Sequence, residues 1–592
     1  MPDKSNPGNG ITRRAALKLG VAAGAAASVA AIAGTTAAQA AAPSSLNEAT
    51  IAQLEGMMHS GALTSSRLVS FYLSRIQALD QSGPGVNSVL ELNPEAREIA
   101  ADLDAERRRK GPRGPLHGIP VLLKDNIDTG DRMQTAAGSL ALVGRPALHD
   151  STVVKNLRAA GAVILGKTNL SEWANFRSTS SSSGWSGRGG QCNNPYFIDF
   201  NPCGSSSGSA AAVSANFCSV GIGSETDGSI VCPANVSGVV GLKPTIGLVS
   251  RAGVVPISHT QDTTGPHGRT CADVATVLGA IQSKTFDGRD PATGGVPLGW
   301  RGIRTRPTNI PSDYTQFLDP NGLLGARLGL WAAGSANASP KEAAAFSASQ
   351  DAMRAAGATL VTFDFDHASD INSGNAEILI LLYDFKLDLQ AYLADRVGVP
   401  IRNLADAIAF NSAHAAAEMP WFGQELFELA QAMDTSSPDA PQPQFGGMTY
   451  NQALDMDQKI GATEGIDKVL KDNKLDAIVA ATANVSWATD LVNGDRPNGF
   501  GASTPPAIVG YPIISVPSAM IKGLPIGVSF FASAFSEPTL IKLASGFEHV
   551  THARSQPKFI REIGLNPNVD SEDHSGGDRG GGPERIARPV MV

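Results

Sequence analysis

Residues 118–125 read Gly-Ile-Pro-Val-Leu-Leu-Lys-Asp, a short apolar run in a frame of Gly and Pro. We expect a buried strand that ends at Lys124, because apolar runs of this length between turn-forming residues are typical of buried strands. Ser151 to Ala160 reads as a helix closed by Gly161, and Ala162 to Leu165 reads as a second apolar strand. A strand, a helix and a strand in succession predict an α/β sheet.

Composition places the chain among globular proteins. Of its 592 residues, 42% are hydrophobic and 17% are charged, which is enough for a sizeable core in one large domain. The formal net charge is -8, and the short run Arg107 to Lys110 is the main basic cluster. This run follows a helical stretch from Pro94 to Glu106 and is typical of a solvated helix end. We therefore expect no nucleic-acid partner.

The two ends of the chain differ from its body. Arg13 and Arg14 precede an uncharged Ala/Gly/Val stretch from Leu19 to Ala33, which resembles a twin-arginine export signal cleaved after Ala40. The stretch is weakly hydrophobic and short for a membrane span, although a retained anchor is the alternative. Residues 561–592 are polar and Gly-rich, which predicts a disordered tail. Residues 41–560 are then the folded domain of an exported protein.

Helical spacing appears in two parts of this domain. Leu46 to Met58 and Thr64 to Asp80 read as two helices, with Thr64 as an N-cap. Further along, an apolar stripe recurs every three or four residues, which predicts a helix packed against the core. The stripe consists of Ile378, Leu382, Phe385, Leu389 and Leu393.

The five cysteines lie between residues 192 and 271, and they form no CxxC pair. Their number is odd, and their spacing is not that of a zinc site. We therefore expect buried free thiols, with neither a metal site nor a disulfide framework. The cysteines are Cys192, Cys203, Cys218, Cys232 and Cys271.

Two serines compete for the role of nucleophile. Gly204-Ser205-Ser206-Ser207-Gly208 matches the G-x-S-x-G elbow of serine esterases, which would make Ser206 the nucleophile. The preceding residues form a poor strand, whereas the elbow follows a strand. Candidate partners downstream are His259, His267, His367 and His414. Ser229 is the other candidate, since the preceding Gly and small polar residues predict a tight turn that could aim several backbone N–H groups at one point.

The serine segments resemble the signature of the amidase signature family. They are followed by Cys232-Pro233-Ala234 and by Gly238-Val239-Val240-Gly241-Leu242-Lys243-Pro244-Thr245, and the interval between Ser205 and Ser229 matches that of the family. Residues 118–125 resemble the strand that carries the family's catalytic lysine. Further landmarks are Gly166 to Glu172, Gly510-Tyr511-Pro512 and Gly523 to Gly527.

This resemblance implies a large mixed twisted β-sheet covered by helices on both faces, and a catalytic triad of Lys124, Ser205 and Ser229. Ser205, preceded by a cis peptide in the family, would relay the proton of Ser229 to a neutral Lys124, whose pKa burial lowers. The backbone N–H groups of Thr226, Asp227, Gly228 and Ser229 would form the oxyanion hole. No metal or cofactor is implied. Lys167 and Lys243 are rival bases without an assigned role in proton transfer.

Within the family, the chain resembles the bacterial peptide amidases through Ser171 to Phe176, Glu225 to Ser229 and Leu381 to Lys386. Ser207 and Asp227 replace the Gly of most family members, as they do in peptide amidases. The resemblance implies hydrolysis of a carboxamide, above all the C-terminal amide of a peptide, to a carboxylate and ammonia. Alternatives are small aliphatic, aryl or lactam amides, an esterase that uses Ser206, and a transamidating subunit, against which the export signal argues.

Overall fold

The computed structural model describes residues 46–295, 306–496 and 500–561. The predicted export signal and residues 562–592 of the predicted tail lie outside the described residues. One compact unit begins at Thr50, and residues 46–49, which belong to the preceding unit, form a short turn. No helix within these ranges is long and apolar enough to cross a membrane.

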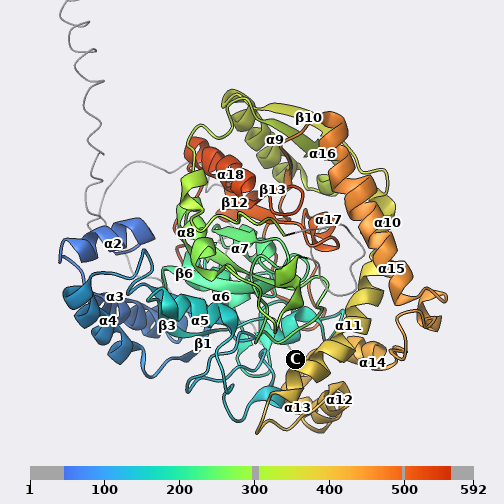
Figure 1. Cartoon of the computed structure of the whole chain (residues 1–592), viewed down its shortest axis with the longest axis horizontal. Coiled ribbons are helices and arrows are strands. Elements are labelled where there is room, and N and C mark those ends of the chain that lie inside the picture. Colours follow the sequence, from blue (N-terminus) through green and yellow to red (C-terminus); the bar gives the residue numbers. More distant parts are fainter. Residues whose placement is uncertain (1–45, 296–305, 497–499, 562–592) are drawn as a thin grey trace, which may run out of the picture. The chain divides into compact units, whose positions relative to one another are not determined.

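Eleven strands of the described residues form one mixed sheet (Figure 1). In spatial order they are β1 (Val89–Leu92), β3 (Val163–Thr168), β2 (Pro120–Lys124), β6 (Val220–Glu225), β8 (Thr263–Gly268), β7 (Val240–Lys243), β12 (Ile513–Ile521), β13 (Leu524–Phe531), β11 (Ala477–Ala481), β9 (Arg327–Trp331) and β10 (Thr359–Phe363). β2 is parallel to both β3 and β6, whereas β6, β8, β7, β12 and β13 pair antiparallel in turn. A small hairpin pairs β4 (Trp185–Ser186) with β5 (Gly190–Gln191).

The α-helices with their bounds are α2 (Ile51–His59), α3 (Ser65–Arg75), α4 (Ala96–Lys110), α5 (Thr152–Ala159), α6 (Ser207–Ser214), α7 (Val231–Val236), α8 (Cys271–Ile281), α9 (Pro340–Ala355), α10 (Ala368–Ser373), α11 (Asn375–Ala394), α12 (Leu404–Ala413), α13 (Ala415–Glu418), α14 (Glu425–Gln431), α15 (Tyr450–Asp457), α16 (Asp467–Asn473), α17 (Thr504–Ala507) and α18 (Glu537–Thr551). Two π-helical segments, η1 (Ile76–Asp80) and η8 (Gln458–Ile466), continue α3 and α15. Single turns of 3-10 helix are η2 (Leu140–Leu142), η3 (Glu172–Asn175), η4 (Pro291–Gly294), η5 (Thr315–Phe317), η6 (Ala333–Ser335) and η7 (Pro443–Phe445).

Helices cover both faces of the sheet. A Cβ atom at Gly221 of β6 would meet α6, and one at Gly268 of β8 would meet α8. Gly221 is paired with His267, the neighbour of Gly268, and successive side chains of a strand point to opposite faces. α6 and α8 therefore lie on opposite faces, which confirms the predicted α/β architecture.

The predicted strand at residues 118–125 is β2, and all five of its residues are buried. The predicted helix and second strand are α5 and β3, and Ser151 caps α5 by accepting a hydrogen bond from Val154 N. The helix predicted from Leu46 is wrong at its start. Thr50 and Gln53 form a capping box there, so α2 begins at Ile51.

The apolar stripe of α11 packs as predicted. Leu382, Phe385, Leu389 and Leu393 are buried in one apolar cluster together with residues of α12, α14 and α15, and Ile378 packs against its edge. α11 therefore has a fixed position against these helices, and its first turn carries Glu377.

Candidate functional site

Lys124 is the last residue of β2, and its side chain is completely buried. Its Nζ atom lies 2.8 Å from Ser205 Oγ and 2.9 Å from Ser224 Oγ, and it also donates to the Ser224 carbonyl at 3.1 Å. Burial lowers the pKa of Lys124 to about 7, although the carboxyl groups of Asp262 and Glu225 oppose this shift. A neutral amine that can accept a proton is therefore accessible near neutral pH.

Ser205 and Ser229 meet directly. The Ser205 hydroxyl donates to Ser229 Oγ at 3.0 Å, so the three predicted side chains form one continuous chain of hydrogen bonds. The peptide bond between Gly204 and Ser205 is cis. A Cβ atom at Gly204 would collide with the Ser171 hydroxyl, which explains why glycine occupies this position.

The turn before Ser229 keeps its backbone N–H groups out of the hydrogen bonds of the described residues. Gly228 has a φ of 75°, and the Glu225 carboxylate closes the turn by accepting from Ile230 N at 2.6 Å and Val231 N at 3.0 Å. Within the described part of the chain, the N–H groups of residues 226–229 donate no hydrogen bond to another residue. These groups are therefore available to a developing oxyanion beside the Ser229 hydroxyl.

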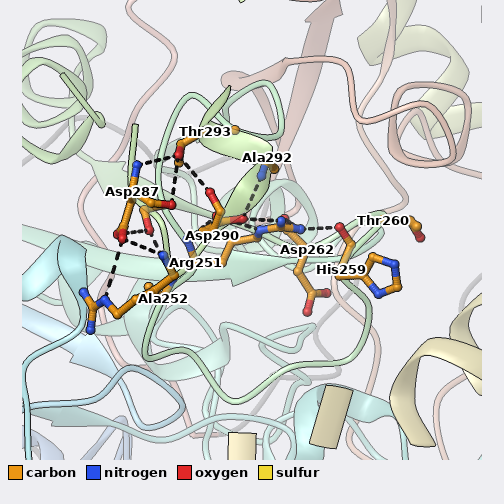
Figure 2. A network of polar contacts seen from close by, with 12 residues as sticks. Arg251, Ala252, His259, Thr260, Asp262, Asp287, Asp290, Ala292 and Thr293 are labelled. Atoms are coloured by element: carbon orange, nitrogen blue, oxygen red, sulfur yellow. Dashed lines mark hydrogen bonds and ion pairs between the residues drawn. The ribbon is translucent and has the colours of Figure 1, made fainter. Parts of the chain in front are cut away.

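A polar network supports this turn. The Thr226 hydroxyl donates to Asp262 Oδ1 at 2.6 Å, and Asp262 Oδ2 accepts from the N–H groups of Ile257 and Ser258. Figure 2 shows Arg251 reaching across from Asp290 toward the carbonyl of His259. Two Arg251 nitrogens, Nη2 and Nε, donate to the two Asp290 oxygens at 2.6 and 3.0 Å, a geometry that fixes the loop carrying Asp262.

Ser206, the rival nucleophile, is completely buried and points at the backbone of β6. Its hydroxyl donates to the Ser224 carbonyl at 3.0 Å and accepts from Ser224 N at 3.2 Å. His267 is near this position, but its Nε2 lies 2.9 Å from the Ile230 carbonyl, and burial lowers its pKa to about 4. No histidine in the described ranges hydrogen bonds to Ser206, so the geometry of an esterase triad is not formed.

The rival lysines contact other parts of the protein. Lys167 donates to the Ile127 carbonyl at 2.6 Å and to Thr135 Oγ1 at 2.8 Å. Lys243 donates to the Tyr511 carbonyl at 2.6 Å. These contacts link loops to the sheet, and neither of them leads to Ser205 or Ser229.

The prediction that all cysteines remain free is wrong. Cys203 and Cys232 form a disulfide, whereas Cys192, Cys218 and Cys271 are free and buried. Cys203 lies two residues before Ser205 and Cys232 three residues after Ser229. The contact between the two serines therefore brings these two cysteines together, and the bond ties together the two segments that carry the hydroxyl groups.

One group among the described residues has the composition of a metal site. The ligand atoms of His259, Asp384 and Asp388 all lie within 4.8 Å of one another. His259 Nδ1 lies 3.0 Å from Asp388 Oδ2 and 3.5 Å from Asp384 Oδ1. Burial lowers the pKa of His259, but the two carboxylates outweigh it and raise the pKa to about 9. The imidazole of His259 is therefore protonated near neutral pH and pairs with the two carboxyl groups.

Two residues of the site had no predicted role. Ser224 lies in β6 and contacts Lys124, Asn126 and Ser206. The alternation of β6 could have identified it, since Ser224 is adjacent to the predicted turn. Asp262 is 36 residues from Thr226 in the sequence, and no local pattern indicates their contact.

The chain is similar in sequence to known amidases. The family model described as Amidase matches residues 67–541. An Arabidopsis thaliana protein described as a probable amidase is 41% identical over 524 residues, which cover 87% of this chain and 92% of the plant protein.

Solved structures agree with these sequence relatives. The native peptide amidase from Stenotrophomonas maltophilia has a TM-score of 0.78 and 46% sequence identity, over 87% of this chain and 99% of that one. An amidase family protein from Bacillus anthracis has a TM-score of 0.73 and 34% identity, over 86% of this chain and 92% of that one. The similarity therefore extends over the whole folded body, including β2, the two serine segments and α11.

Proposed function

This chain belongs to the amidase signature family of carbon–nitrogen hydrolases, and we propose that its own substrate is an unsubstituted carboxamide, above all the C-terminal amide of a peptide. The products are a carboxylate and ammonia. The 46% identity to a peptide amidase supports this substrate class. Asp227 in the turn before Ser229 also supports it, because the bacterial peptide amidases share this departure from the glycine of most family members.

The observation that carries the proposal is the chain of hydrogen bonds from Lys124 Nζ through Ser205 Oγ to Ser229 Oγ. A serine hydroxyl is a weak nucleophile until a base removes its proton. In the proposed attack, Ser229 Oγ bonds to the amide carbon while its proton passes to Ser205 Oγ, and the Ser205 proton passes to Lys124. The N–H groups of residues 226–229 hydrogen bond to the resulting oxyanion.

The same relay runs in reverse when the carbon–nitrogen bond breaks. Lys124 returns a proton through Ser205 to the leaving nitrogen, which departs as ammonia and leaves an ester on Ser229. Water then attacks the ester carbon, and its proton follows the same path toward Lys124. The carboxylate is released when the proton returns to Ser229 Oγ. Every proton transfer uses an amine or hydroxyl of this chain.

Ammonia release tests the proposal directly. We expect purified enzyme to release ammonia from N-acetyl dipeptide amides with higher kcat/KM than from acetamide, benzamide or a lactam. The matched control is Ser229→Ala, which removes the attacking oxygen and nothing else. A wild-type enzyme that prefers small amides would overturn the peptide assignment. Equal ammonia release by Ser229→Ala would overturn the nucleophile.

We further propose that the enzyme is exported by the twin-arginine route. The support is in the sequence, where Arg13 and Arg14 precede an uncharged stretch and the small residues Ala38-Gln39-Ala40. An enzyme outside the cytoplasm would encounter peptides in the surroundings of the cell.

A further inference from the structure

A group of buried oxygen-bearing side chains surrounds Asp227, two residues before Ser229. Asp227 Oδ2 accepts from Thr504 Oγ1 at 2.7 Å. The Asp227 carboxyl group also interacts with the Ser503 side chain and with the carboxyl group of Glu377, in the first turn of α11. Glu377 Oε1 accepts from Gln261 Nε2 at 2.9 Å. Asp457, the last residue of α15, interacts electrostatically with Glu377. Four separate segments thus converge beside the turn that carries the nucleophile.

Several oxygens of this group have no hydrogen-bond donor. Asp227 Oδ1, Gln261 Oε1 and Asp457 Oδ2 are buried and have no partner among the described residues. Gln261 and Asp457 are only 1% and 3% exposed. Buried polar atoms without partners are rare because each loses its hydration without compensation. Three such acceptors in one group indicate a missing donor.

The group holds more acidic than basic side chains. Asp227, Glu377 and Asp457 contribute three carboxyl groups. The charged groups that face them from neighbouring strands are Lys243 of β7 and Glu225 of β6, which is itself a carboxyl group. Burial raises the pKa of Asp227, and burial together with the charge of Asp227 raises that of Glu377 well above its usual value. Burial also raises the pKa of Asp457 to about 8.

We propose that Asp227, Glu377, Gln261 and Asp457 form a subsite for a positively charged group of the substrate, an ammonium or a guanidinium. This inference rests on the proposed hydrolysis of carboxamides. An ammonium brings several N–H donors and a positive charge, so it satisfies the unpaired oxygens and balances the carboxylates at the same time. Asp227 and Glu377 are both partly exposed, which leaves an approach to the subsite from outside. The enzyme then prefers amides that carry a cation on the acyl side.

A neutral N–H group of a peptide would satisfy one acceptor but would not stabilise the ionised form of the carboxyl groups. The pH dependence of the substrate preference distinguishes a cation from a neutral N–H donor. Carboxyl groups with raised pKa lose their charge as the pH falls, so a preference for cations must decline toward acidic pH. A preference for neutral donors would not decline in this way.

The test compares two amides of similar size, N-acetyl-lysinamide and N-acetyl-norleucinamide. We expect wild-type kcat/KM to be about tenfold or more higher for the lysine amide, the size of effect that a hydrogen bond to a charged group supplies. In Glu377→Gln and in Asp457→Asn this ratio should fall to about two or less. Asp395→Asn removes an exposed carboxylate at the other end of the same helix and should preserve the wild-type ratio.

Each result decides the inference. The ratio is independent of the amount of active enzyme, so partial unfolding of a variant does not imitate the expected change. A wild-type ratio near one, with both amides hydrolysed, would overturn the cation subsite and leave the proposed function intact. A high ratio that persists in both Glu377→Gln and Asp457→Asn would assign the preference to other residues. Failure to hydrolyse either amide would overturn the proposed function and the subsite with it.

Discussion

At the scale of single residues, two buried lysines differ in the groups that surround them. Lys124 and Lys167 are both fully buried, and burial lowers the pKa of each. Lys167 donates to a carbonyl and a threonine, and the carboxyl groups of Asp125 and Asp128 favour its charged form. Lys124 instead contacts two serine hydroxyls, of which Ser205 leads to the nucleophile. Burial alone therefore does not make a base, whereas burial beside a transferable proton does.

Replacement of Lys124 by Arg tests its role as a base. Arg retains the positive charge but cannot lose its proton in a protein. We expect Lys124→Arg to lower kcat/KM by about 10²-fold or more, as Lys124→Ala should, because general acid–base assistance supplies about 10²- to 10⁴-fold. Circular dichroism controls for folding. A folded Arg variant with more than about a tenth of wild-type kcat/KM would contradict the role.

The pH profile supplies a second readout of the same residue. Lys124 accepts a proton only when neutral, and its pKa is lowered to about 7. Wild-type kcat/KM should therefore decline as the pH falls below about 7, and the residual activity of Lys124→Ala should lack this limb. An unchanged limb in Lys124→Ala would assign it to another group.

Ser206 offers a matched comparison with Ser205, since the two hydroxyls are adjacent in sequence. Ser206→Ala removes two hydrogen bonds to the backbone of Ser224 and should cost about 1 kcal/mol of unfolding free energy per bond, while activity remains measurable. Ser205→Ala breaks the relay and should abolish activity.

Fluorophosphonate labelling followed by peptide mapping should modify Ser229. Modification of Ser206 would favour the esterase alternative.

At the scale of elements, two segments that are distant from β2 in the sequence lie at the end of this strand. α6 follows Ser205, and α7 begins two residues after Ser229. The disulfide between Cys203 and Cys232 links the loop before α6 to α7 itself, so it restrains both serine segments at once.

Removal of this disulfide should affect stability more than it affects chemistry. The bond closes a loop with a sequence separation of 29, for which the chain-entropy relation gives about 3.5 kcal/mol of stabilisation. We expect Cys203→Ser/Cys232→Ser to lower the free energy of unfolding by about this amount in urea titrations. Cys192→Ser alters a buried free thiol and is the control for loss of a sulfur atom. A reducing agent should destabilise the wild type and leave the double variant unchanged. An equal effect on both would show that the bond does not form.

Sequence patterns were sufficient for the parts of the site that lie within continuous motifs. β2 is a short apolar run that ends at Lys124, and the turn before Ser229 is rich in Gly and small polar residues, so both could be predicted. The Thr226–Asp262 contact joins the residue after β6 to the residue before β8, and the order β6–β8–β7 is visible only in the folded structure. The disulfide does not follow from the number and spacing of the cysteines. It follows from the contact between Ser205 and Ser229, which brings Cys203 and Cys232 close together.

At the scale of the whole molecule, the proposed export route and the disulfide constrain each other. The twin-arginine route transports proteins that have already folded, and the cytosol keeps thiols reduced. A chain exported by this route must fold, with Ser205 and Ser229 in contact, before Cys203 and Cys232 are oxidised. The large sheet and the buried cluster around α11 provide a core that does not depend on the bond.

Replacement of both Arg13 and Arg14 by Lys tests this order of events. The change retains two positive charges but removes the guanidinium pair that the twin-arginine route reads. We expect the precursor to remain in the cytosol, folded and resistant to protease, with Cys203 and Cys232 reduced. The exported wild type should carry the disulfide. Cell fractionation combined with alkylation of free thiols and mass spectrometry measures location and redox state in one sample. Lys18→Arg, which changes a nearby cation without touching the pair, should be exported normally. Continued export of the double variant would indicate another route, and a disulfide already formed in the retained precursor would contradict oxidation after transport.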